Sequence, residues 1–123
     1  MFDLDKLSPR AKKCFDVAKQ EARRLKHATF DTDHLLLGLL RQEREWLADL
    51  LRPYHVDTKH LAQAVESHLG RGEVPSPPKL KVSPELKKAL YHSAELTPSG
   101  RIEPPHLLLA LVETDSDLRA ILK

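Results

Sequence analysis

Small and apolar residues near the start of the chain recur at steps of three and four, the spacing of one buried face of an α-helix. They are Leu7, Ala11, Cys14, Phe15, Ala18, Ala22 and Leu25. Ser8 and Pro9 mark the beginning, because a serine side chain can cap the first backbone N–H groups and proline suits the first helical position. The pattern predicts a helix over residues 8–25.

The same pattern returns later in the chain. Ser83 and Pro84 open a second stripe, in which each residue follows its counterpart by 75 positions: Val82, Leu86, Ala89, Leu90, Ser93 and Thr97. A leucine-rich helix is also duplicated, with Asp33 to Leu40 and Pro105 to Val112 lying 72 positions apart. The two offsets differ by three residues, and this difference falls in the loops before Phe30 and Ile102. We expect the side chains of Phe30 and Ile102 to close the end of the core. Two copies of one helical repeat are therefore predicted.

Further helices are predicted over about 45–52, where Pro53 ends the pattern, and over about 58–69, where Gly70 is a suitable C-cap. Residues 117–122 repeat the first of these two patterns. The proline-rich stretch 71–81 shows no periodicity and is expected to be an extended connector. We expect one all-α domain over 1–123 with about seven helices. Its two tandem repeats, about 7–70 and about 82–123, pack around a pseudo-twofold axis, and the second lacks its last helix.

Composition narrows the class of partner. The chain is 41% hydrophobic but only 5% aromatic, which is typical of a helical core rich in leucine and alanine. Its 20 basic and 18 acidic residues leave a net charge of +2, too small a field to indicate nucleic acid or a membrane surface. The single cysteine, Cys14, excludes a disulfide framework and is expected to be a buried thiol. No secretory signal or long apolar run is visible, so a cytoplasmic location is predicted.

The histidines are the only residues that raise the question of metal or catalytic chemistry. His34 and His106 occupy equivalent positions, but neither has a second ligand at metal-binding spacing, so a structural hydrogen bond at each helix start is the preferred interpretation. His55, His60 and His68 are expected on the surface. The chain has no phosphate-binding glycine loop and no metalloprotease or nucleophile motif, so we expect no cofactor, no metal and no enzyme activity.

The first repeat carries the motif that identifies a family. The run Thr32-Asp33-His34-Leu35-Leu36-Leu37-Gly38-Leu39-Leu40 resembles the Clp repeat motif, with aspartate where glutamate is usual. Upstream, Glu21-Ala22-Arg23-Arg24-Leu25-Lys26-His27 is similar to a second family run. The chain thus resembles the N-terminal domain of Clp unfoldases over nearly its whole length, and is closest to the ClpC and ClpA type.

This resemblance implies candidate binding residues. In Clp proteins of Gram-positive bacteria the acidic residue of the motif contacts the guanidinium group of phosphoarginine. The resemblance therefore makes Asp33 the candidate contact, within a candidate site formed by Thr32, Asp33 and His34. The ordinary interpretation is a capping threonine followed by an acid that complements the helix dipole, and both interpretations stay open. The resemblance also places a candidate adaptor surface on Lys19, Glu21, Arg23 and Arg24. The apolar residues Leu4, Leu7, Leu80 and Val82 are candidates for lining a groove between the halves, where an extended apolar substrate segment would bind, and core packing is their ordinary interpretation. Solvated helix faces are the ordinary interpretation for the charged ones.

The function implied is a non-catalytic domain that docks adaptors or substrate polypeptides for a Clp ATP-dependent unfoldase. The chain would act within that protein or as a free-standing modulator, in cis or in trans to the AAA+ ring, and would be monomeric by itself. An alternative is the N-terminal domain of a ClpB-type disaggregase, suggested by the segments 4–8 and 118–123. Its ligand would be unfolded, apolar polypeptide.

Overall fold

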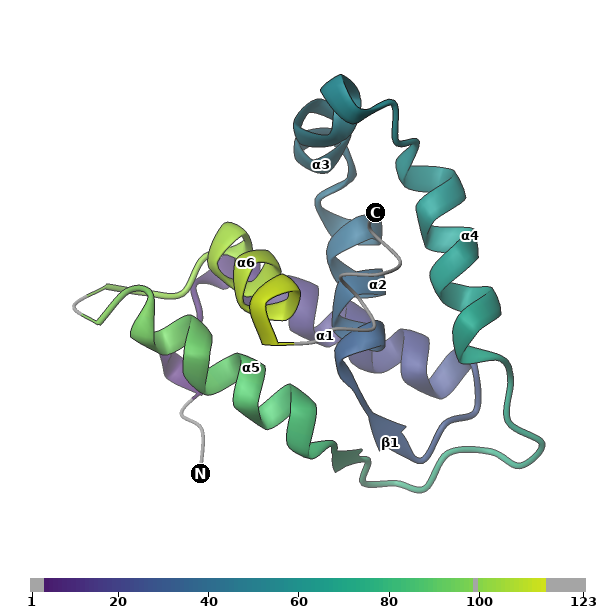
Figure 1. The fold of residues 1–123 in the computed structure, drawn as a ribbon. Coiled ribbons are helices and arrows are strands. Elements are labelled where there is room, and N and C mark those ends of the chain that lie inside the picture. The colour runs from purple at the N-terminus through teal and green to yellow at the C-terminus, as the bar shows by residue number, and fades with distance from the viewer. Residues whose placement is uncertain (1–3, 99, 115–123) are drawn as a thin grey trace.

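The computed structural model describes residues 4–98 and 100–114, and this part of the chain contains six α-helices (Figure 1). They are α1 (Pro9–Arg24), α2 (Thr32–Gln42), α3 (Arg44–Leu51), α4 (Thr58–Leu69), α5 (Pro84–Glu95) and α6 (Pro104–Thr114). Two 3-10 turns, η1 (Leu4–Lys6) and η2 (Arg52–Tyr54), and two short strands, β1 (Thr29–Phe30) and β2 (Lys81–Val82), complete the order. The all-α class is confirmed, whereas the helix expected over 117–122 lies outside the described residues.

The first helix of each repeat begins as predicted. The Ser8 side chain accepts a hydrogen bond from the Ala11 backbone N–H at 3.1 Å, and the Ser83 side chain accepts one from Leu86 at 3.0 Å. Proline follows each serine at the first helical position. Two of the otherwise unpaired N–H groups at these helix starts are satisfied in this way, which fixes where α1 and α5 begin.

Each repeat is entered through a strand contact with the other repeat. The two parallel contacts are Leu7 with Ile102 and Phe30 with Val82. The Ser8 N–H donates to the Ile102 carbonyl at 2.9 Å, and the Ser83 N–H donates to the Phe30 carbonyl at 3.0 Å. These two bonds join equivalent positions in exchanged order. The start of α1 is therefore anchored to Ile102, just before α6, and the start of α5 is anchored to Phe30, just before α2.

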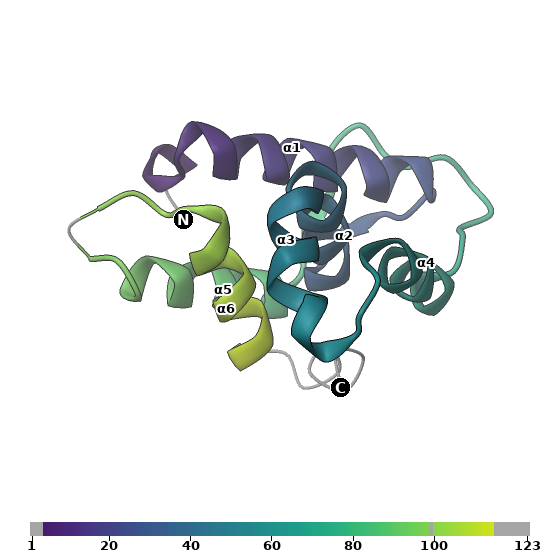
Figure 2. The same cartoon turned by 90° about the horizontal axis from the view of Figure 1, so that it is seen from above.

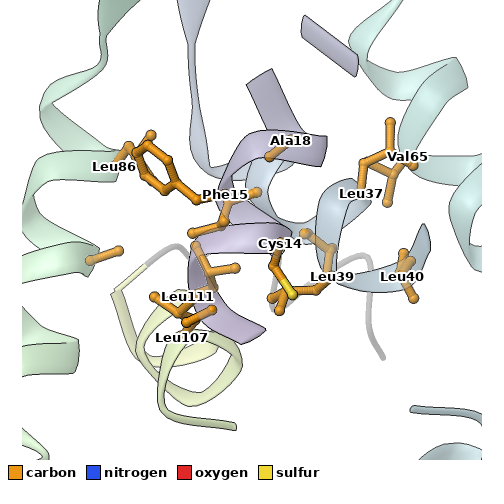
Figure 3. Packing of buried hydrophobic residues seen from close by; sticks show 14 of the residues in the cluster. Cys14, Phe15, Ala18, Leu37, Leu39, Leu40, Val65, Leu86, Leu107 and Leu111 are labelled. Atoms are coloured by element: carbon orange, nitrogen blue, oxygen red, sulfur yellow. The ribbon is translucent and has the colours of Figure 1, made fainter. Parts of the chain in front are cut away.

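The core lies where α1 crosses α2 and reaches α5 and α6 (Figures 1 and 2). Figure 3 shows side chains from several helices in this cluster, with Cys14 and Phe15 of α1 among them. Burial raises the pKa of the Cys14 thiol to about 12, so the thiol stays protonated at neutral pH and the expected buried cysteine is confirmed. Phe30 and Ile102 are also fully buried, as expected.

The absence of a side chain at Gly38 allows α1 and α2 to approach closely. A Cβ atom at this position would lie 2.6 Å from the Cys14 carbonyl oxygen and 2.8 Å from the Ala18 backbone nitrogen. Both are backbone atoms, which cannot move aside as a flexible side chain can. The equivalent residue in the second repeat is Ala110, so the two repeats differ at this contact.

The connector between the repeats is fastened to the loop after α1. The Gly72 N–H donates to the Leu25 carbonyl at 2.8 Å, and the Ser76 hydroxyl donates to the His27 carbonyl at 2.7 Å. The segment then enters β2 and pairs with β1. In the described part of the chain no helix combines the length and hydrophobicity needed to cross a bilayer.

Candidate functional site

The candidate site begins at the N-terminal end of α2. Asp31, whose backbone is extended, occupies the N-cap position, and its carboxylate accepts a hydrogen bond from the Thr32 N–H at 2.7 Å. The predicted threonine cap is therefore wrong. The strand pair that includes Phe30 sets this boundary, because Asp31 is the first residue after it and must turn the chain into the helix.

His34 closes the cap from the other side. Its Nδ1 accepts the Asp31 N–H at 2.9 Å, and its Nε2 lies 2.7 Å from His27 Nδ1. Because Nδ1 accepts a hydrogen bond, the single proton of the neutral ring is on Nε2, which donates a hydrogen bond to His27 Nδ1. Burial, followed by the charge of His27, lowers the pKa of His34 to about 4, which keeps the ring neutral. His106 Nδ1 accepts the Glu103 N–H at 2.9 Å, so the predicted structural role of both histidines is confirmed.

The other two motif residues are almost covered. Thr32 is 1% exposed and Asp33 9% exposed. Asp33 Oδ2 lies 3.8 Å from Nε2 of His68 on α4, so the ring of a residue expected only on the surface stands beside the carboxylate. A ligand that contacts Asp33 at Oδ2 would therefore lie close to His68, whose side chain is half exposed.

Glu21 and Arg24 belong to an ion-pair network that joins α1, α2 and α4. The Glu21 carboxylate accepts from Nε of Arg24 at 2.6 Å and from Nε of Arg41 at 2.9 Å. Glu66 accepts from the same two arginines. Burial by itself would raise the pKa of Glu21, but the hydrogen bonds from Arg24 and Arg41 outweigh it and hold the pKa below its usual value. The solvated face expected for Glu21 is therefore wrong, because its side chain is buried within the network.

Arg23 is exposed but also engaged. Its two terminal guanidinium nitrogens donate to the carbonyls of Pro77 and Pro78, each at 2.8 Å, and hold the connector beside α1. Lys19 Nζ lies 5.1 Å from the ring centre of Phe15, within reach of a cation–π contact.

Leu80 and Val82, the two apolar candidates at the end of the connector, are half-buried and pack against the core. The side chain of Leu4 lies outside the described residues. Arg23 contacts the connector at Pro77 and Pro78, whereas Val82 pairs with Phe30, so the described residues of the predicted surface are not gathered into one patch.

Two hollows lie away from the residues expected to line a groove: neither is lined by Leu7, Leu80 or Val82, and Leu7 is buried in the core. An apolar groove of about 140 Å³ lies between the repeats and is lined by Leu36, Leu40, Leu47, Leu51, Leu61, Leu108 and Val112. A polar cleft of about 350 Å³ lies at the α2–α3 junction and is lined by Arg10, Arg41, Gln42, Glu43, Arg44, Glu45 and Trp46. One feature of the sequence is consistent with the apolar groove: Leu36 and Leu40 occupy the same repeat positions as Leu108 and Val112.

Sequence comparison gives a family match over almost the whole chain. Residues 6–123 match the Clp repeat (R) N-terminal domain. The chain is 30% identical over 118 residues to the negative regulator of genetic competence ClpC/MecB of Bacillus subtilis, covering 94% of this chain and 14% of that protein. It is 28% identical, with the same coverage, to the ATP-dependent Clp protease ATP-binding subunit ClpC of Staphylococcus aureus. The chain thus spans about 14% of the length of these relatives.

Solved structures show the same fold. The N-terminal domain of Hsp104 from Candida albicans superposes with a TM-score of 0.76 at 19% identity, covering 94% of this chain and 78% of the other. The N-terminal domain of the ClpV1 ATPase from E. coli gives 0.76 at 24% identity, covering 98% and 78%. At these identities the likeness concerns the arrangement of helices and not the ligand.

Proposed function

Because the chain belongs to the Clp repeat N-terminal domain family, we propose that it is a non-catalytic docking domain for adaptors or substrate polypeptides of a Clp AAA+ unfoldase. It would act as part of that protein or as a free-standing, monomeric modulator in trans. The match over residues 6–123 is the observation that carries this proposal. A reducing, cytoplasmic setting suits it, since Cys14 is a free thiol.

The use of the polar side chains supports a scaffold for binding. His34 is neutral and caps a helix, Glu21 is matched by two arginines, and Arg23 holds the connector. These groups position helices and leave the surface between them to contact a partner. ATP hydrolysis would come from the AAA+ ring, since the chain has no phosphate-binding loop.

The apolar groove favours one class of ligand within this proposal, the unfolded apolar polypeptide of the ClpB-type alternative. Its lining presents only apolar side chains, drawn from both repeats. A volume of about 140 Å³ admits a large aliphatic side chain from an extended segment. Burial of such a side chain contributes roughly 1.5–3 kcal/mol, so several segments of an unfolded chain could compete for the groove.

A finer proposal concerns phosphoarginine at Thr32, Asp33 and His34. The Asp33 carboxylate would face the guanidinium group, and the phosphate would face a backbone N–H of the first turn of α2 that the Asp31 carboxylate does not hold. The second repeat has Pro105 in place of the acid, so it offers neither a carboxylate nor an amide hydrogen at this point. One site per chain is therefore proposed at most.

Amide chemical shifts of the labelled chain, titrated with permanently unfolded casein, test the docking function. We expect shifts at residues that line the apolar groove, and weaker binding by Leu108→Gln. Leu109→Gln is the matched control, because Leu109 is the next residue of α6, is 47% exposed and does not line the groove. Equal binding by both variants would place the ligand elsewhere, and no shift at any casein concentration would count against substrate docking.

A further inference from the structure

The polar cleft opens between the first turn of α1 and the junction of α2 with α3. Glu43 lies on its floor with a side chain only 9% exposed and is ion-paired with Arg10. The charges that face solvent are different: the side chains of Arg10 and Arg41 are 62% and 44% exposed, and Arg44 and Glu45 are also exposed. Three guanidinium groups and one carboxylate therefore line the accessible part of the cleft.

Arg44 has the most freedom to bind a ligand. Arg10 is paired with Glu43, and Arg41 is paired with Glu21 and Glu66. Across residues 4–98 and 100–114 the structure gives Arg44 no ion pair. Its neighbourhood holds an excess of exposed positive charge, so a carboxylate entering the cleft would gain a charge-assisted hydrogen bond without having to break an existing pair.

An apolar stripe continues from this cleft along the outside of α3. Trp46 lines the cleft and is half-buried, and Leu50, one turn further, is 45% exposed. Tyr54 follows after another four residues, in η2, and is 74% exposed. Within α3, the i, i+4 spacing places Trp46 and Leu50 on one face of the helix. Tryptophan, tyrosine and arginine are also the residues most enriched at the energetic centres of protein interfaces.

We propose that the outer face of α3 and the arginine-lined cleft at its N-terminal end form a docking surface for an acidic, amphipathic helical segment of a partner protein. The leucine-type side chains of that segment lie along Trp46, Leu50 and Tyr54, and its carboxylates enter the cleft beside Arg44. The inference rests on the proposed docking function and names the chemistry of an adaptor. Figure 1 shows α3 at the end of the molecule opposite β1.

Trp46 is the only tryptophan in the chain and reports directly on this surface. The probe is a helical peptide of about 16 residues with leucines at i, i+4 and i+8 and glutamates on the flanks. We expect it to shift Trp46 emission saturably. Arg44→Gln and Leu50→Gln should each weaken binding by about fivefold or more, a change of about 1 kcal/mol. The matched controls are Arg101→Gln and Leu109→Gln, since Arg101 is also exposed and Leu109 matches Leu50 in exposure.

A peptide of the same design with lysines in place of the glutamates should bind at least about tenfold more weakly. The proposal is overturned if the two peptides bind equally, if the control variants lose as much affinity as the test variants, or if no binding occurs. A concentration-dependent dimer that Leu50→Gln abolishes would overturn it in favour of self-association. Casein titration separates this failure from that of the docking function, because casein shifts in the apolar groove do not depend on α3's outer face.

Discussion

The Ser83 hydroxyl donates to the Asp31 carboxylate at 2.6 Å, so the residue that caps α5 is bonded to the residue that caps α2. Ser83→Ala should therefore cost more than the loss of one cap. We expect a loss of about 2 kcal/mol in the free energy of unfolding, against about 1 kcal/mol for Ser8→Ala, which removes only a cap. Urea denaturation measures both, and equal losses would show that the bond to Asp31 contributes nothing net.

The neutral, buried His34 should make stability depend on pH. Its pKa is about 4 in the folded chain and about 6.5 when unfolded, so the unfolded state binds more protons between these values. Stability is then fully present above pH 6.5 and falls as the pH drops toward 4, by about 3 kcal/mol. His34→Gln, whose amide oxygen can still accept the Asp31 N–H, should flatten this dependence. NMR measures the pKa of the ring directly, and a His34 pKa near 6.5 in the folded chain would contradict the prediction.

Because α1 and α2 approach closely at Gly38, adding a methyl group there and removing one at the equivalent Ala110 should both destabilise the chain, for different reasons. Gly38→Ala should destabilise the chain by about 2 kcal/mol, since the overpacking cost against Cys14 and Ala18 exceeds the gain of about 1 kcal/mol in helix propensity. Ala110→Gly, the reciprocal change in the second repeat, should cost about 1 kcal/mol through propensity. Thermal unfolding of both variants checks this, and a stabilised Gly38→Ala would show that the helices separate easily.

Arg23 should control the mobility of the connector more than global stability. Removing its bonds to Pro77 and Pro78 by Arg23→Gln should speed hydrogen exchange at the Gly72 and Lys81 amides by about fivefold or more. Arg52→Gln, which removes an exposed ion pair with Asp49, is the control and should leave both rates unchanged. Unchanged exchange in Arg23→Gln would mean that the other connector bonds suffice.

Phosphoarginine offers a sharp test of the helix start. If it binds at Asp33, its guanidinium must compete with His68, so His68→Ala should increase the affinity and Asp33→Asn should abolish it. Free phosphoarginine, followed through the amides of Thr32, Asp33 and His34, gives the readout. If phosphoarginine shifts none of these amides in either the wild type or His68→Ala, the proposed phosphoarginine site is wrong.

The helices were predictable because each leaves a periodic trace of its own. The 3.6-residue stripes and the Ser-Pro starts locate α1 and α5, and Gly70 marks the end of α4. The exchanged strand contacts left no such trace, since each involves only one or two residues and is defined by its partner from the other repeat.

The candidate site was predictable only as a position. The capping histidine follows from the repeated spacing of His34 and His106, but Asp31, Thr32 and Asp33 can all cap a helix, and packing against β2 selects Asp31. The burial of Glu21 and the approach of His27 to His34 depend on how α1, α2 and α4 meet. Contacts between elements far apart in sequence are not encoded in the periodicity of any one of them.

The exchanged bonds from Ser8 to Ile102 and from Ser83 to Phe30 bear on how such a chain could arise. A chain with only one repeat would have the serine N–H that donates and the carbonyl that accepts. Neither group would have its partner, because that partner belongs to the other repeat. Two copies could supply both by trading them across a twofold axis, as symmetric dimers do. In these terms the present chain has the architecture of a homodimer fused into one polypeptide, with the proline-rich segment as the fusion joint.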